Sequence, residues 1–352
     1  MARFFALSAL AAAAIFSTSA QAASLDAQQI LQQFNVVTLG DVVTTSHVDG
    51  RSYVSGSISG QNAVFGMHPD DMPASNYAAL TVMGKGVAAG QAAVNNVQVT
   101  DFGAVVYGNI TNSTVNNGHS AIYGDSTNTS YNGSGTVYAS GTISGGNIAH
   151  KLDEVAAGSV QAVNTAAATS TNFSYVLGEL SSSMSAFKST GSSVAIADKT
   201  ATFTAVEKNG VAVFDLTSID SDLFDYNKVT QFAFDLGSAT TVYLNTDITS
   251  ANINVNFLAD SAKWAGKSLI WNFYAATDLT IDAQFGGSIL ALNANLVQNQ
   301  NIEGGVYVDN LDSRAEIHLN PFIGAVPEPE TYAMLLAGLG LVGFVARRRK
   351  SA

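Results

Sequence analysis

Hydrophobic and polar positions divide the chain into a short helical stretch, a region of strands, a second helical region and a second region of strands. Apolar residues at Leu25, Ile30, Leu31 and Phe34 follow helical spacing and predict a short leading helix. From Phe34 to Ile148, apolar and polar residues alternate over short runs that end at Gly, Asn or Ser. This alternation is typical of strands with one buried face.

A weak repeat lies inside the first strand region. Val105–Ile110 is followed 16 residues later by Ala121–Ser126, and about 15 residues after that by Thr136–Gly141. A short strand that returns at this interval predicts the coils of a β-solenoid. A sandwich of hairpins would give a similar spacing, with Asn117-Gly118 and Asn132-Gly133 as its turns. The solenoid is favoured because side chains of one type recur at one phase of the repeat.

The pattern turns helical between residues 148 and 188. Apolar residues recur there at intervals of three and four, with interruptions at Gly158 and at Thr165–Asn172. We expect two helices, or one long broken helix, lying against the strands because the segment carries little charge. Strands return from Ser193 to Phe322. The expected fold is mainly β: a right-handed β-solenoid with a long helix packed alongside.

Composition narrows the functional classes. The 352 residues include no cysteine, which excludes disulfides, thiol catalysis and cysteine metal sites. Charged residues make up only 12% of the chain, and the remaining polar positions are mostly Ser, Thr and Asn, which suit the stacked ladders of a solenoid. The formal net charge is −12 and the few Lys and Arg are scattered, so the sequence argues against a nucleic-acid partner.

The first 22 residues have the layout of a secretory signal peptide. Arg3 gives a positive n-region, Phe4–Phe16 gives an apolar h-region, and Ala20 and Ala22 frame a small-x-small cleavage site. We expect cleavage after Ala22, so that the mature chain begins at Ala23. This leader predicts export through the inner membrane.

The end of the chain, residues 326–352, forms a second signal. Val326-Pro327-Glu328-Pro329 is followed by an apolar run over residues 332–346, a predicted transmembrane helix, and then by Arg347-Arg348-Arg349. This tail resembles the PEP-CTERM sorting signal of Gram-negative, exopolysaccharide-producing bacteria. The resemblance implies processing by an exosortase in the inner membrane, and a final place at the cell surface or in the extracellular matrix. A permanent anchor without processing would show the same pattern.

Residues 23–325, between leader and tail, are expected to form one domain. Two opening blocks and four closing blocks carry a resemblance: Phe34–Asp41, Val48–Arg51, Trp271–Phe273, Gly287–Ala291, Asn301–Gly304 and His318–Phe322. They resemble the choice-of-anchor A domain, an adhesive module of bacterial surface proteins. The resemblance implies a β-solenoid flanked by a helix, similar to ice-binding proteins, and supplies no catalytic residues. With Arg3 and the tail's four basic and two acidic residues set aside, this middle part keeps ten basic and 25 acidic residues, a formal charge of −15.

Carboxylates are the only candidates for acid–base or metal chemistry. Asp220, Asp222 and Asp225 form an acidic cluster whose oxygens suit Ca²⁺, although the segment lacks the glycine and the distal Glu of an EF-hand loop. Glycoside hydrolysis needs two opposed carboxylates, and sequence spacing does not show their separation. The five histidines lack metal-ligand spacing, and there is no G-x-S-x-G motif. Solvated loop acids are the plainest interpretation, so calcium is the one cofactor candidate and no catalytic residue is expected.

The sequence favours a non-enzymatic adhesin or matrix protein that binds exopolysaccharide or another surface in a biofilm. Tyr107, Tyr123 and Tyr138 are candidate positions for stacking on sugar rings, and they suit a core stack equally well. One alternative is a polysaccharide-acting enzyme built on a β-helix. The other is an ice-binding protein, although no strict Thr-x-Thr motif repeats at the coil period.

Overall fold

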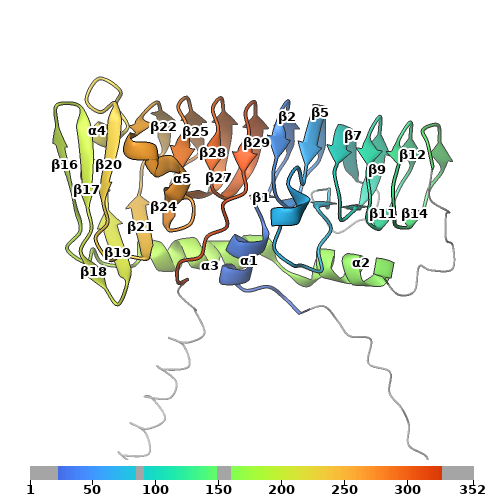
Figure 1. The fold of residues 1–352 in the computed structure, drawn as a ribbon, viewed down its shortest axis with the longest axis horizontal. Helices are drawn as coiled ribbons and strands as arrows, with labels where there is room; N and C mark the ends of the chain where they lie inside the picture. Colours follow the sequence, from blue (N-terminus) through green and yellow to red (C-terminus); the bar gives the residue numbers. More distant parts are fainter. Residues whose placement is uncertain (1–22, 85–90, 149–159, 327–352) are drawn as a thin grey trace, which may run out of the picture.

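The computed structural model describes residues 23–84, 91–148 and 160–326 (Figure 1). Within these ranges most strands belong to one sheet of 26 strands, whose pairings are almost all parallel. The expected mainly β architecture is therefore confirmed. The predicted leader at residues 1–22 and the predicted membrane span at 332–346 lie outside the described residues. Inside the described ranges, every helix is too short or too polar to cross a membrane.

Equivalent strands of successive coils stack into three faces. The helix face consists of β19 (Val211–Asp215), β21 (Thr241–Thr246), β24 (Leu269–Phe273), the first halves of β27 (Ser288–Gln298) and β29 (Val306–Ser313), β1 (Val36–Thr38), β4 (Ser52–Val54), β6 (Leu80–Val82), β8 (Ala104–Val106), β11 (Ser120–Ile122) and β14 (Val137–Ala139). The polar face consists of β22 (Ser250–Ile253), β25 (Asp278–Ile281), the second halves of β27 and β29, β2 (Val42–Thr44), the first halves of β5 (Ile58–Phe65) and β7 (Ala92–Val99), β9 (Gly108–Thr111), β12 (Ser126–Thr127) and β15 (Ile143–Ser144).

The third face completes the coils. It consists of β26 (Phe285–Gly286), β28 (Ile302–Glu303), β30 (Ile317–His318), β3 (His47–Val48), the second halves of β5 and β7, β10 (Thr114–Val115) and β13 (Ser130–Tyr131). At one end of the stack a separate four-stranded sheet takes its place, made of β16 (Ser193–Ala197), β17 (Thr200–Thr204), β20 (Gln231–Asp235) and β23 (Asn256–Phe257). Beside it β18 (Glu207–Lys208) forms a hairpin with β19.

The chain enters the stack in its middle and leaves it there as well. It winds from β1 to one end at β14 and β15, returns along the stack as helices, and winds back from β16 until β29 and β30 reach the first coil (Figure 1). The register of this junction pairs Val36 with Val306, Val42 with Leu311, and Val48 with Ile317. We call this junction the seam. Two halves of the chain thus share one continuous core.

Residues of the helix face are buried on both sides. In β1, Val36 belongs to the core inside the coils, whereas the next residue, Val37, packs among the helices. The same alternation places Val54 inside and Tyr53 outside in β4. A strand covered on both sides needs apolar residues at every position, which explains its continuous apolar runs.

Three helices cover this face along most of its length. They are α1 (Ala27–Gln33), α2 (Val160–Ser170) and α3 (Phe173–Ser185), and Phe173, Leu177, Leu180 and Met184 form the buried stripe of α3. Asn172 accepts a hydrogen bond from the backbone N–H of Tyr175 at 3.1 Å and so caps α3 after the break. The predicted leading helix and the broken second helix are therefore confirmed for the described residues. The part of the predicted helical segment at 149–159 lies outside them.

The coil prediction needs two corrections. The dipeptides Asn117-Gly118 and Asn132-Gly133 lie at corners between parallel strands, so the hairpin alternative is wrong. The third repeat unit also begins two residues later than predicted, because Ala121 pairs with Val105 on one side and with Tyr138, not Thr136, on the other. The coil lengthens from 16 to 17 residues there because its corner holds an extra residue. Right-handed winding stays a prediction.

Short helices complete the described part: α4 (Asp220–Leu223), α5 (Ser261–Ala265) and the 3-10 turns η1 (Pro69–Asp71) and η3 (Leu258–Asp260). Of these, α5 packs on β26 and β28 of the third face. The polar face carries no helix in the described ranges, and this difference defines the candidate site.

Candidate binding face

A row of small side chains runs the length of the polar face and points outward. Strand register places its members side by side, one from each coil, and all are exposed or half-exposed. In order along the stack they are Asn252, Thr280, Val297, Asp312, Val43, Ser59, Asn95, Thr111, Thr127 and Ser144. Neighbouring strands lie about 4.8 Å apart, so hydroxyl and amide groups recur at that interval. The row is a flat, repetitive surface without a Lys or Arg of its own.

A second row, two residues earlier in each strand, is tied together by hydrogen bonds. Asn310 donates to Asn295 at 2.9 Å, and its own Oδ1 accepts the backbone N–H of Asp41 at 2.8 Å. Asp41 in turn accepts the backbone N–H of Ser57 at 2.9 Å. Farther along, Asp125 accepts the N–H of Thr142 at 2.7 Å. Such ladders fix side chains that would otherwise move freely, so the edge of the polar face is ordered before any ligand arrives.

The three candidate tyrosines lie on the helix face instead. The rings of Tyr107 and Tyr123 stack at 4.5 Å, and Tyr138, displaced by the longer coil, meets Tyr123 edge-on at 6.0 Å. Tyr107 is buried, and the Tyr123 hydroxyl donates to Thr165 of α2 at 2.9 Å. The rings therefore contact one another and the helix, which is the geometry of a core stack. Stacking of sugars on them stays a prediction.

The acidic cluster does not form one site. Asp220 is buried and accepts a hydrogen bond from Thr246 at 2.7 Å, whereas Asp222 pairs with Lys228 at 2.5 Å. Asp225 binds the backbone and side-chain amides of Asn227, and these hydrogen bonds lower the pKa of its carboxyl group. Each carboxylate thus has a partner of its own. Nowhere in the described ranges do three His, Cys, Asp or Glu side chains gather as a metal site. Calcium binding by this cluster stays a prediction.

The third face carries a row of alternating imidazoles and carboxylates at the seam. His318 lies between Glu303, 2.8 Å from its Nδ1, and Glu316, 2.7 Å from its Nε2. Glu316 also lies 3.4 Å from His47 of the first coil. The hydrogen bond to Glu303 is the largest cause that raises the pKa of His318, to about 9, against the opposing effect of burial. At neutral pH His318 is therefore cationic and forms ion pairs with Glu303 and Glu316 beside the seam.

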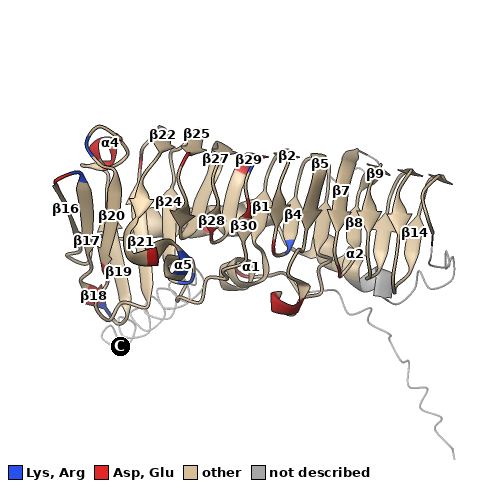
Figure 2. Cartoon of the chain, turned by 45° about the horizontal axis from the view of Figure 1, so that its top comes forward, with Lys and Arg blue, Asp and Glu red and all other residues tan. Residues whose placement is uncertain are grey.

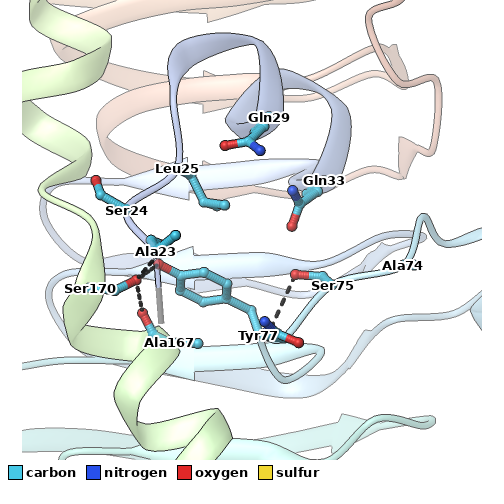
Figure 3. Close-up of a pocket in the computed structure, with 11 residues that line it drawn as sticks. Ala23, Ser24, Leu25, Gln29, Gln33, Ala74, Ser75, Tyr77, Ala167 and Ser170 are labelled. Atoms are coloured by element: carbon cyan, nitrogen blue, oxygen red, sulfur yellow. Dashed lines mark hydrogen bonds between the residues drawn. The ribbon is translucent and has the colours of Figure 1, made fainter. Parts of the chain in front are cut away.

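A pocket of about 440 Å³ lies between α1, α2 and the segment 74–77 (Figure 3). Ser170 of α2 donates to the carbonyl of Ala23 at 3.4 Å, and the Tyr77 hydroxyl lies 3.3 Å from the hydroxyl of Ser170. The lining residues are Ala23, Ser24, Leu25, Gln29, Gln33, Ala74, Ser75, Asn76, Tyr77, Ala167 and Ser170. They include no carboxylate, imidazole or amine side chain, so the pocket offers no acid–base pair for catalysis.

The described residues thus form a parallel coil stack with one helix-covered face and one polar face. Residues 27–319 match the family model described as a putative ice-binding-like adhesive domain. The chain belongs to this family. A match of that extent covers both halves of the stack and the helices between them, and membership of an adhesive family indicates a non-enzymatic role.

Next to this adhesive domain, residues 325–350 match the PEP-CTERM protein-sorting motif. Both resemblances expected from the sequence are thus confirmed. The motif implies processing by an exosortase, and it indicates export to the surface or exterior of a Gram-negative cell. No curated protein and no solved structure matches the chain.

Sequence reasoning missed the polar rows of the adhesive domain. Their signal was present as short alternations such as Ser57-Ile58-Ser59 and Ala93-Val94-Asn95, in which the middle residue is buried. The alternation shows that such residues point outward, but it does not show that they align across coils. Alignment depends on corner lengths, which vary along the stack.

Proposed function

We propose that this adhesive domain is a non-enzymatic surface or matrix protein whose polar face binds exopolysaccharide. The observation that carries the proposal is the division of the stack: helices cover one face, while two ordered polar rows lie open on another. A flat row of hydroxyl and amide groups at a constant interval suits a long, hydroxyl-rich polymer. Each contact is weak, and affinity would come from their number.

The ends of the described chain support this orientation. Ala23 is held by Ser170 of α2, and the carbonyl of Ala325 accepts a hydrogen bond from Tyr243, whose ring stacks on Phe187 just after α3. Both ends therefore leave from the side of the helices, below the stack in Figure 1. A tail held at the inner membrane, before or without processing, would turn the helix side toward the lipid and leave the polar face free.

The proposal includes the sequence-based route to the surface. The leader at 1–22 is removed between Ala22 and Ala23, the domain at 23–325 folds outside the inner membrane, and exosortase acts on the tail at 326–352. In this view the apolar run at 332–346 holds the protein in the inner membrane until processing. Mass spectrometry of the mature protein tests both ends of the chain.

The decisive experiment compares exopolysaccharide binding by the exported protein and two double variants. Ser59→Glu with Asn95→Glu places two bulky carboxylates side by side on the polar face. The matched control, Ser174→Glu with Ser182→Glu, adds the same charge to exposed positions of α3. We expect the first variant to lose binding and the control to keep it.

The polysaccharide is followed by its chain length over time in the same experiment. Binding without shortening supports an adhesin. Shortening by the unchanged protein would favour the alternative of a polysaccharide-acting enzyme and overturn the proposal. Equal binding by both double variants would show that the polar face is not the binding surface.

Ice binding is the second candidate, and the description of the family favours it. The outward row of the polar face includes Thr111, Thr127 and Thr280, but its other members are Asn, Ser, Val or Asp, so it is not a continuous row of threonines. A thermal hysteresis measurement decides between the two functions, because exopolysaccharide binding alone produces no hysteresis at micromolar protein.

A further inference from the structure

One of the two tryptophans is exposed on the third face. Trp264 of α5 keeps 42% of its surface accessible, whereas Trp271 in β24 is completely buried in the core. Leu258, next to α5, is also exposed, at 37%. An exposed indole costs hydrophobic free energy unless something covers it in function. Trp264 therefore stands out on a surface made mostly of small polar residues.

The short helix α5, which carries Trp264, is tightly packed against its neighbours. The glycine at 286 in β26 lies so close to α5 that a Cβ there would overlap the Cα of Ala262. From the other side, Asn320 donates to the carbonyl of Lys263 at 2.6 Å. The ring of Phe234 meets the indole edge-on at 6.0 Å. A short helix held on three sides presents the free part of the indole in a fixed position.

Two lysines lie close to Trp264 in the sequence of an otherwise acidic domain. Lys263 precedes Trp264, and Lys267 lies one turn later, its backbone N–H donating to the Trp264 carbonyl at 3.4 Å. Both lysines are exposed, and neither has an ion-pair partner within 4.0 Å among the described residues. Figure 2 shows the blue of Lys and Arg on α5. By contrast, the cations of Lys228 and Arg314 are paired with aspartates.

We infer that Trp264, Lys263 and Lys267 form a stacking site for a sugar residue of an acidic polysaccharide. The apolar C–H face of a sugar ring suits the negative face of an indole. A carboxylate on the same sugar would meet two exposed ammonium groups, of which that of Lys263 also helps to lower the pKa of Glu303. The inference rests on the proposed function and names its ligand class, since the third face adjoins the polar face at the corner between β25 and β26.

The two tryptophans allow a direct test with the unlabelled, exported protein. Acrylamide, a neutral quencher, reaches Trp264, while the buried Trp271 supplies a constant background. We expect polygalacturonate, used as the acidic probe, to protect Trp264 from quenching, and neutral dextran to leave it unprotected. Salt should weaken this protection, because exposed lysines bind anions through screened charges.

Three variants assign the binding to these residues. Trp264→Ala should weaken polygalacturonate binding by about tenfold, as for truncation of an anchoring aromatic residue. Its remaining emission comes from Trp271 and reports whether the core is intact. Lys263→Gln with Lys267→Gln should weaken binding and flatten its salt dependence. Tyr175→Ala, which removes an aromatic ring that is 64% exposed on α3, is the control and should bind normally.

The outcomes separate this inference from the proposed function. Binding of acidic polysaccharide with unchanged quenching and a neutral effect of Trp264→Ala would overturn the inference and leave the polar face as the binding surface. Equal protection by dextran would overturn the acidic ligand class. Failure to bind polygalacturonate and the exopolysaccharide of the source bacterium would overturn the proposed function, and the inference with it.

Discussion

Single side chains on the third face connect the first coil with the last coil at the seam. His47 of the first coil lies 3.4 Å from Glu316 of the last coil, so this contact crosses the seam, and Glu316 is in turn paired with His318 inside the last coil. Because the folded pKa of His318, about 9, exceeds its ordinary value of 6.5, its contribution to stability is complete below pH 6.5 and is lost as pH rises through 9. Hydrogen bonding to His318 lowers the pKa of Glu316. The contribution of Glu316 to stability is therefore complete above its ordinary pKa of 4.5 and is lost as pH falls through the lowered value. We expect the melting temperature to be highest between about pH 4.5 and 6.5.

Melting curves of His318→Gln check this prediction. The variant should melt lower than the unchanged protein at pH 6 and should lose less stability between pH 6.5 and 9.5. His119→Gln is the matched control, since His119 bonds the hydroxyl of Thr136 and lies near no carboxylate in the row. A decline above pH 7 that is equally steep in His318→Gln would contradict the assignment. From the sequence, the histidines showed only a lack of metal-ligand spacing. The pair of His318 with Glu303 could not be predicted, because Glu303 lies 15 residues away and meets His318 only through coil register.

Corners are the elements that set the register of the coils. At one corner of three successive coils, Asn112 and Asn128 adopt positive φ angles of 51° and 49°, and Gly145 occupies the equivalent position with φ of 68°. Asparagine and glycine tolerate this left-handed conformation, whereas a β-branched residue does not. Asn128→Val should therefore lower the free energy of unfolding by about 1–2 kcal/mol. Asn128→Gly should cost less, and the neighbouring strand substitution Thr127→Val should change stability by less than about 0.5 kcal/mol.

Urea denaturation of these three variants measures the difference, and equal midpoints for Asn128→Val and Thr127→Val would refute it.

Local sequence patterns predict single elements of this fold but not the lengths of its corners. The leading helix and the strand-forming segments follow from periodicity, and Asp26 and Gln29 even form a capping box that closes the first turn. The displacement of Tyr138 did not follow from periodicity. The corner before it holds one additional residue, which shifts every later residue of that coil by one position relative to the preceding coil.

The topology of the whole molecule lay beyond any local pattern. Val36 pairs with Val306 because the second half of the chain returns to the first coil, and sequence spacing holds no signal for a pairing across 270 residues. What the sequence did contain was the order of strands, helices and strands. That order is compatible with two separate domains as well as with one stack. Only the seam, and the helices that run along both halves, show that the core is continuous.

A continuous core predicts how the molecule opens. In repetitive folds each coil is stabilised by its neighbours, so coils with a neighbour on both sides should open last. At the seam, β29 pairs with β27 on one side and with β1 and β2 on the other, whereas β14 and β15 pair, among the described strands, with one neighbouring strand each. Hydrogen exchange followed by mass spectrometry should therefore find the slowest amides in β1 and β29, and much faster exchange in β14 and β15.

Two further features of the molecule sharpen this expectation. The antiparallel strand β16 pairs only with β17 among the described strands, so the opposite end of the stack should also exchange early. His318→Gln removes ion pairs at the seam without changing either end, and it should therefore raise exchange in β30 and β3 more than in β14. If the seam exchanged as fast as the ends in the unchanged protein, the halves would be opening as separate units. The polar face would then be two short surfaces rather than one long one, and affinity for a long polymer would fall accordingly.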